Sequence, residues 1–137
     1  MFEYKTVIKL HEADAAGIMF FANYFRLVHD AFEAFMDANG LGPGKILKER
    51  EYILPLVHAS MDYKSSLYPG DRVTIRSMLN NTKNSSFILR HEILKLNGDG
   101  KGEVITAIGE TVHVSIDRFT GKKVPLPEEL KVILSRM

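Results

Sequence analysis

The stretch YFRLVHDAFEAFMDA, residues 24–38, decides the fold class of this chain. Apolar residues recur every three or four positions in it, namely Tyr24, Leu27, Val28, Ala31, Phe32, Phe35 and Ala38. The charged residues Arg26, Asp30, Glu33 and Asp37 fall between them. This spacing predicts an amphipathic helix with a wide buried face. Gly40, Gly42 and Pro43 follow and predict the end of the helix. We expect a short second helix over residues 45–50.

The segments on both sides of this helix have the composition of β-strands. We expect strands over residues 4–10, 53–64, 72–79, 87–96 and 103–116, and a C-terminal helix over residues 126–137. Residues 97–100, Asn-Gly-Asp-Gly, predict a hairpin turn between the last two strands. Gly109 lies within the last strand and suggests a bulge or bend there.

This order of elements, β-α-β-β-β-β, predicts an α+β domain in which the long central helix lies on an antiparallel sheet. We expect the last four strands to run back and forth. The 137 residues suit a single domain, residues 1–137. A sheet of so few strands covers one helix on one side only. We therefore expect its other face or an edge to need a partner subunit, and the protein to self-associate as a dimer or tetramer.

Composition excludes several classes of function. The formal net charge of +1 lacks the basic excess of a general nucleic-acid binder. The absence of cysteine removes disulfides, thiol nucleophiles and thiolate metal sites. None of the five histidines has the spacing of a metal-ligand pair, so we expect neither a metal nor a cofactor. We also expect no membrane span and no signal peptide, and a cytoplasmic location.

The candidate chemistry lies just before the long helix, where residues 11–24 read HEADAAGIMFFANY. The start of a helix offers unpaired amides and partial positive charge, which suit an oxyanion. The carboxylate of Asp14 would face the other side of a carbonyl held there, and Gly17 would let the backbone approach a substrate closely. Spacing alone favours a turn-capping role for Asp14, because Asp before helices is very common, and it leaves Glu12 as a rival carboxylate.

The segment DAAGIMFFANY, residues 14–24, resembles the signature of the 4-hydroxybenzoyl-CoA thioesterase family of hotdog proteins. Three further stretches extend the match in the same order: LPLVHASMDY over residues 54–63, YPGD over 68–71 and SSF over 85–87. Within the family the chain most resembles the 1,4-dihydroxy-2-naphthoyl-CoA thioesterases of quinone biosynthesis. The Asp-Ala-Ala-Gly and Phe-Phe-Ala-Asn elements, His58 and the Pro-Leu-Pro-Glu-Glu of residues 125–129 carry this finer resemblance.

The resemblance implies the hotdog fold, a long central helix wrapped by an antiparallel sheet, and hydrolysis of an aromatic acyl-CoA thioester. The implied substrate is 1,4-dihydroxy-2-naphthoyl-CoA in menaquinone or phylloquinone biosynthesis. The family's catalytic carboxylate falls on Asp14, either as a nucleophile or as a general base for water. The family's carbonyl-polarising amide falls on the backbone N–H of Phe21, and Gly17 belongs to the same catalytic loop.

The resemblance also implies a set of substrate-binding residues: Asn23, His58, Lys83, Asn84, Ser85 and Ser86. The last four align with contacts to coenzyme A phosphates, and His58 is either a lining residue of the acyl pocket or a hydrogen-bonded strand residue. Family members bind coenzyme A at a dimer interface, so residues 83–86 are expected to serve the neighbouring subunit's Asp14.

Two other functions stay open. One is a general medium-chain acyl-CoA or acyl-carrier-protein thioesterase, which a panel of thioesters distinguishes. The other is a non-catalytic acyl-binding module, which predicts binding without turnover. A hotdog dehydratase is disfavoured, because that chemistry uses a histidine on the loop before the helix and His11 lies upstream of the matched motif.

Overall fold

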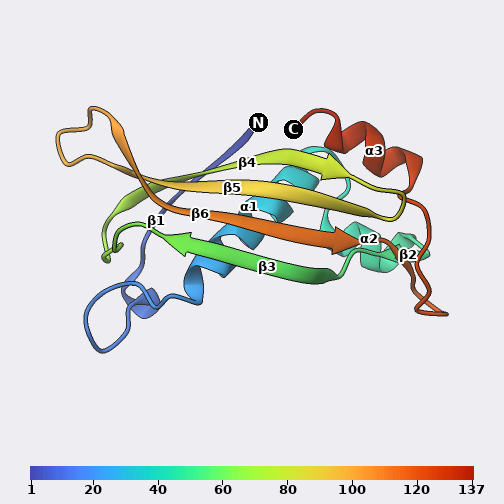
Figure 1. Ribbon diagram of the computed structural model, residues 1–137, viewed down its shortest axis with the longest axis horizontal. Helices are drawn as coiled ribbons and strands as arrows, with labels where there is room; N and C mark the ends of the chain where they lie inside the picture. The colour runs from blue at the N-terminus through green and yellow to red at the C-terminus, as the bar shows by residue number, and fades with distance from the viewer.

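The long helix α1 (Asn23–Ala38) lies across one face of a five-stranded antiparallel sheet in the computed structural model, which describes residues 1–137 (Figure 1). The strands follow the order β1-β4-β5-β6-β3, with β1 (Phe2–Val7), β3 (Leu56–Tyr63), β4 (Arg72–Thr82), β5 (Ser86–Leu96) and β6 (Glu103–Val114). The predicted α+β class, with its long helix on an antiparallel sheet, is confirmed.

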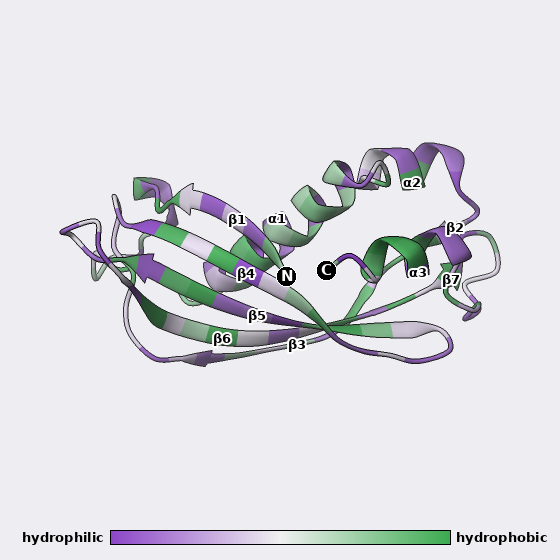
Figure 2. Ribbon diagram, turned by 90° about the horizontal axis from the view of Figure 1, so that it is seen from above, coloured by the Kyte–Doolittle hydropathy of each residue, from purple (hydrophilic) through white to green (hydrophobic).

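Smaller elements close the ends of this sheet. They are the 3-10 turn η1 (Leu10–Glu12), α2 (Pro43–Glu49), α3 (Glu128–Leu134) and a two-stranded ladder of β2 (Tyr52–Ile53) with β7 (Ile116–Asp117). The two predicted short helices are therefore present, with their ends shifted by a few residues. All helices lie on the same side of the sheet (Figure 2). None of them is long and apolar enough to cross a lipid bilayer.

The predicted apolar stripe of α1 forms the centre of the core. Its buried residues are Tyr24, Leu27, Val28, Ala31, Phe32, Phe35 and Met36. The first half of the stripe packs on Val73, Ile75 and Ile93 of the sheet. The second half packs on strand β5 and on α3, which closes that end of the core. Met36 replaces the predicted Ala38, which is exposed at the end of the helix.

The prediction that residues 53–64 form one strand of a back-and-forth sheet is wrong. Pro55 separates β2 from β3, and β3 pairs with β6 at the far edge of the sheet, not with β4. The connection over residues 64–71 packs against the loop before α1, where Met19 N–H donates to Leu67 O at 2.8 Å. This connection carries the chain from β3 at one edge of the sheet to β4, which pairs with β1 near the other edge. One edge of β3 therefore has no neighbouring strand.

The bulge expected at Gly109 lies at Thr106 instead. The register between β5 and β6 shifts from Ile93–Ala107 to Leu94–Ile105, whereas Gly109 pairs regularly with strands on both sides. The missing side chain at Gly109 instead leaves space for a residue of the neighbouring strand β3. A Cβ atom at Gly109 would lie 2.8 Å from Met61 Sδ and 3.0 Å from Ser60 O, so a side chain there would displace the end of Met61 and crowd the backbone of β3.

Candidate active site

Asp14 lies in a closed loop between η1 and α1. Its N–H donates to Ile18 O at 2.8 Å, and Gly17 N–H donates to Asp14 O at 3.0 Å with Gly17 at φ +81°. The Asp14 carboxylate accepts a hydrogen bond from Ala16 N–H at 2.8 Å. This is the turn-capping geometry that spacing alone allowed. The side chain is nevertheless exposed, so a free carboxylate oxygen faces outward from the loop.

The backbone amide of Phe21 is free at the start of α1. The preceding amide, Phe20 N–H, donates to Glu12 O at 2.9 Å, and Asn23 N–H donates to Phe20 O at 2.9 Å. Phe21 N–H makes no hydrogen bond within the chain. It therefore presents an unpaired donor at the positive end of a 16-residue helix, the arrangement that stabilises an oxyanion.

Glu12, the rival carboxylate, is buried, and its side chain already has protein partners. Its side chain forms an ion pair with Arg26 of α1 and accepts a hydrogen bond from Lys9 N–H at 2.8 Å. Its carbonyl oxygen accepts one from Asn23 Nδ2 at 2.8 Å. These contacts tie the loop to the helix. They also give Asn23, predicted to bind substrate, a structural partner at the start of α1.

Tyr63, at the end of β3, contacts the start of α1. Its hydroxyl donates to Phe21 O at 2.8 Å, and its ring meets the Tyr24 ring edge-on at 4.8 Å. Burial raises the pKa of both phenols, so they stay protonated donors at neutral pH. In the sequence, the only sign of a role for Tyr63 is its place in the stretch LPLVHASMDY, which matches the family.

His58 lies on the other face of the sheet. Along β3, Met61 packs against the core under α1, and residues on a strand alternate between faces. His58 is three positions before Met61 and pairs with Val112 in regular register, so its exposed side chain points away from α1 and from Asp14. It also makes no hydrogen bond. Within one chain, neither role expected for His58 is seen.

Residues 83–86 form the tight turn between β4 and β5. Lys83 N–H donates to Ser86 O at 2.8 Å, and the carbonyls of Asn84 and Ser85 accept hydrogen bonds from residues of the C-terminal segment. The turn lies at the opposite end of the eleven-residue strand β4 from the Asp14 loop (Figure 1). A single chain therefore does not bring these four residues together with Asp14.

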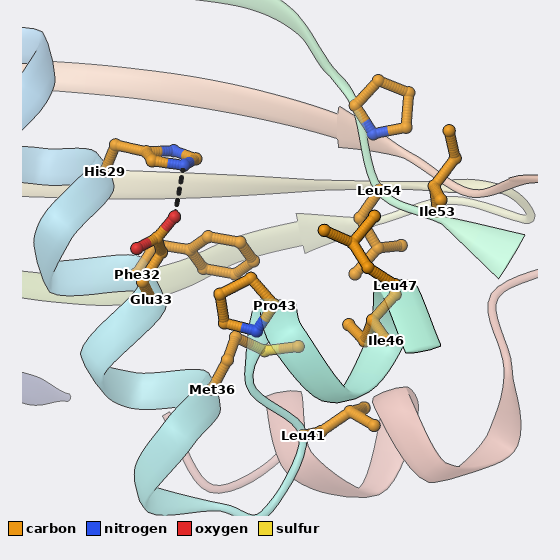
Figure 3. Close-up of a pocket in the computed structure, with 11 residues that line it drawn as sticks. His29, Phe32, Glu33, Met36, Leu41, Pro43, Ile46, Leu47, Ile53 and Leu54 are labelled. Atoms are coloured by element: carbon orange, nitrogen blue, oxygen red, sulfur yellow. Dashed lines mark ion pairs between the residues drawn. The ribbon is translucent and has the colours of Figure 1, made fainter. Parts of the chain in front are cut away.

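An apolar cavity of about 260 Å³ lies between α1, α2 and residues 53–55. Side chains from all three segments point into it, including Phe32, Met36, Ile46, Leu47, Ile53 and Leu54 (Figure 3). Its charged lining is one pair on α1, in which His29 Nε2 lies 3.2 Å from Glu33 Oε1. The sequence does not predict this cavity, because its walls come from separate segments whose apolar residues have the pattern of an ordinary core.

No cluster of three His, Asp or Glu side chains is placed to hold a metal ion. The chemistry available is that of a carboxylate, an unpaired amide at a helix start and a separate apolar cavity.

The profile of the thioesterase-like superfamily matches residues 8–134. The chain belongs to this superfamily. Two relatives in the thioesterase-like superfamily are named 1,4-dihydroxy-2-naphthoyl-CoA hydrolase. The one from Rippkaea orientalis is 31% identical over 130 residues, which cover 95% of this chain and 92% of the relative. The one from Picosynechococcus is 31% identical over 126 residues, which cover 92% of this chain and 86% of the relative.

Solved structures of thioesterases share the fold. A 1,4-dihydroxy-2-naphthoyl-CoA thioesterase from Synechocystis superposes with a TM-score of 0.90 at 26% identity, covering 99% of this chain and 96% of its own. A 4-hydroxybenzoyl-CoA thioesterase gives a TM-score of 0.85 at 18% identity, covering 96% of each chain, which shows the shared fold alone. The chain is therefore a hotdog protein of the thioesterase-like superfamily, as the resemblance implied.

Proposed function

We propose that this protein is an acyl-CoA thioesterase that hydrolyses an aromatic acyl-CoA, with 1,4-dihydroxy-2-naphthoyl-CoA of menaquinone or phylloquinone biosynthesis as its substrate. The observation that carries the proposal is one short loop that presents both the exposed carboxylate of Asp14 and the unbonded amide of Phe21. The named activity of relatives at 31% identity over nearly the whole chain supports the substrate.

In this mechanism the thioester oxygen accepts a hydrogen bond from Phe21 N–H, and the helix start stabilises the negative charge that develops on it. Asp14 acts by one of two routes. As nucleophile, its carboxylate bonds to the carbonyl carbon, the C–S bond breaks, coenzyme A leaves as thiolate, and water then hydrolyses the anhydride. As general base, it takes a proton from the attacking water and passes it to the leaving thiolate.

A single turnover in H₂¹⁸O tests for the nucleophilic route. If water opens the anhydride at the carboxyl carbon of Asp14, one ¹⁸O atom enters the Asp14 carboxylate, and one ¹⁶O atom of Asp14 leaves in the acid product. The general-base route puts label only into the acid product. Label in the Asp14 peptide, measured by mass spectrometry after one turnover, would identify the nucleophilic route.

The proposed site is completed by a second copy of the chain. In one chain the Asp14 loop lies at the end of β3 (Figure 1), whereas residues 53–55, which line the apolar cavity, directly precede its start. The eight-residue strand, about 25 Å long, therefore separates them. The open edge of β3 carries exposed Leu56 and Val57. If two copies pair antiparallel through this edge, two-fold symmetry lays each Asp14 loop beside the other copy's cavity and its residues 83–86. Association of such dimers into tetramers and a cytoplasmic location belong to the same proposal.

The test is a hydrolysis panel of aromatic and aliphatic acyl-CoA thioesters on wild type and Asp14→Asn. Asp14→Asn should lower kcat by about 100- to 10,000-fold, because it removes the base or nucleophile. It should leave the melting temperature unchanged, because asparagine can still cap the Ala16 amide. Asp99→Asn is the matched control, since Asp99 caps Lys101 N–H with the same 2.8 Å geometry in a distant hairpin.

Each alternative function has its own outcome. Faster turnover of medium-chain aliphatic thioesters than of hydroxylated aromatic ones would support a general thioesterase. Binding of thioesters without turnover by the wild type would support an acyl-binding module and overturn the proposal.

A further inference from the structure

We propose that the cavity between α1 and α2 binds the ring system of a hydroxylated aromatic acyl group, and that His29, held by Glu33, hydrogen-bonds a hydroxyl on that ring. This inference rests on the proposed function and deepens it. It assigns the group that selects the acyl part of the substrate, and it places that group in the copy opposite the attacking Asp14.

The size and lining of the cavity suit a small flat ligand. Its volume of about 260 Å³ lies just below the range of about 300 to 1,000 Å³ typical of sites for drug-sized molecules. The walls come from α1, α2 and the Pro55 segment, and their apolar side chains face one another across the space (Figure 3). A cavity of this size and apolar lining can hold one or two fused rings.

The polar pair gives the cavity a specific recognition group. His29 and Glu33 lie one helical turn apart, and the 3.2 Å contact between Nε2 and the carboxylate orients the imidazole (Figure 3). Nδ1 of His29 makes no hydrogen bond within the chain. A phenolic hydroxyl fits it in either protonation state, because a hydroxyl both donates and accepts.

A second histidine, which has no hydrogen-bond partner, lies behind the cavity residues Phe32 and His29. His113 of β6 is 1% exposed, and neither of its ring nitrogens has a hydrogen-bond partner. Its ring lies 4.5 Å from the Phe32 ring and 6.3 Å from the His29 ring, and both of these residues line the cavity. His113 does not itself line the cavity, so its contribution is the packing of its ring against Phe32 and His29, which do.

The cavity lining adjoins, along the chain, the edge where the second copy is proposed to pair. Leu47, which lines the cavity, is 60% exposed. Pro55 also lines the cavity, and Leu56 and Val57 follow it on the open edge of β3 with 46% and 56% exposure. In the proposed dimer this edge joins the ring site of one copy to the Phe21 amide of the other.

The test compares two thioesters that differ only in their ring hydroxyls, 1,4-dihydroxy-2-naphthoyl-CoA and 2-naphthoyl-CoA. Wild type should prefer the hydroxylated substrate by about 10- to 100-fold in kcat/KM, because a site built to bond a hydroxyl rejects the analogue that lacks it. His29→Phe should bring this ratio close to 1, and Glu33→Gln should lower it by less. Glu49→Gln, an exposed glutamate at the end of α2, is the matched control and should keep the wild-type ratio.

A binding measurement makes the test independent of turnover. Calorimetry of 1,4-dihydroxy-2-naphthoate and 2-naphthoate on Asp14→Asn, with and without His29→Phe, should show about tenfold tighter binding of the hydroxylated acid only where His29 is present. Equal preference in wild type and His29→Phe, with Asp14-dependent hydrolysis intact, would overturn this inference and leave the proposed function standing. No hydrolysis of either thioester by wild type would instead overturn the proposed function.

Discussion

At the scale of single residues, Glu12 and Asp14 are two carboxylates only two positions apart that differ in burial and therefore in role. Glu12 is 3% exposed, and its carboxylate forms an ion pair with Arg26 and accepts a hydrogen bond from a backbone amide. Asp14 is exposed, and its carboxylate accepts a hydrogen bond from one amide of its own loop. A carboxylate buried in an ion pair is costly to disengage, whereas an exposed one is free to approach a substrate. The structure therefore favours Asp14 for chemistry and Glu12 for holding the loop.

Two buried histidines make stability depend on pH. His91 lies between Ser77 Oγ at 2.7 Å and Thr111 Oγ1 at 2.8 Å, whereas His113 is stacked on Phe87 without a polar partner. Burial lowers the pKa of each imidazole to about 4. The unfolded chain, with histidine pKa values near about 6.5, binds protons more readily than the folded chain.

Stability from these groups should be complete above about pH 6.5 and fall as the pH drops toward 4, by about 2 kcal/mol for each histidine at pH 5. Urea unfolding at pH 7 and pH 5 measures the difference. His113→Phe keeps the aromatic stack and removes one titrating group, so it should lose about half of this pH dependence. An unchanged dependence in His113→Phe would contradict the assignment.

At the scale of elements, the position of β3 depends on one glycine of its neighbour. Met61 of β3 lies over Gly109 of β6, which has no side chain to displace it. Tyr63 follows two residues later and bonds the carbonyl of Phe21. A shift of β3 would therefore move the end of the strand that contacts the start of α1.

Gly109→Ala should destabilise the protein by about 1 to 3 kcal/mol, because the added Cβ would lie 2.8 Å from Met61 Sδ and 3.0 Å from Ser60 O. Thermal unfolding measures this loss. Gly98→Ala, where a Cβ meets nothing within 4 Å, should stay within about 0.5 kcal/mol of wild type. Met61→Ala added to Gly109→Ala should recover part of the loss. The same melting temperature for Gly109→Ala and wild type would show that β3 is not constrained there.

At the scale of the whole molecule, the two halves of the proposed site lie at opposite ends of an edge strand. An exposed edge with apolar side chains is a template for pairing with another chain. The proposed pairing through β3 would bring the start of α1 of one copy, with its unpaired amide, beside the apolar cavity of the other, and it would produce two equivalent sites.

Ser60→Lys tests this arrangement, because Ser60 is exposed near the middle of β3, where two-fold pairing would bring the two new ammonium groups close together. Sedimentation at micromolar concentration should show a dimer for wild type and a folded monomer for Ser60→Lys. Hydrolysis should fall at least tenfold with the loss of the dimer. Ser135→Lys, on the exposed end of α3, is the control and should remain dimeric and active. Full activity in a monomeric Ser60→Lys would place the whole site within one chain.

The local features of this protein follow from sequence alone. The stripe of α1 and the hairpin at residues 97–100 depend on spacing and on residue type within short segments, so they were predictable and are present. The segment DAAGIMFFANY was likewise visible as a motif before any fold was known.

Only the tertiary structure decided which distant segments meet. The pairing of β3 with β6, the burial of Glu12 against Arg26, and the cavity walled by α1, α2 and Pro55 join residues far apart in the chain. The apolar residues Ile108 and Val112 mark β6 as a strand, yet both are only partly buried, whereas Gly109 and Thr111 between them are buried. Such outcomes depend on register and packing between elements, which local residue patterns do not encode.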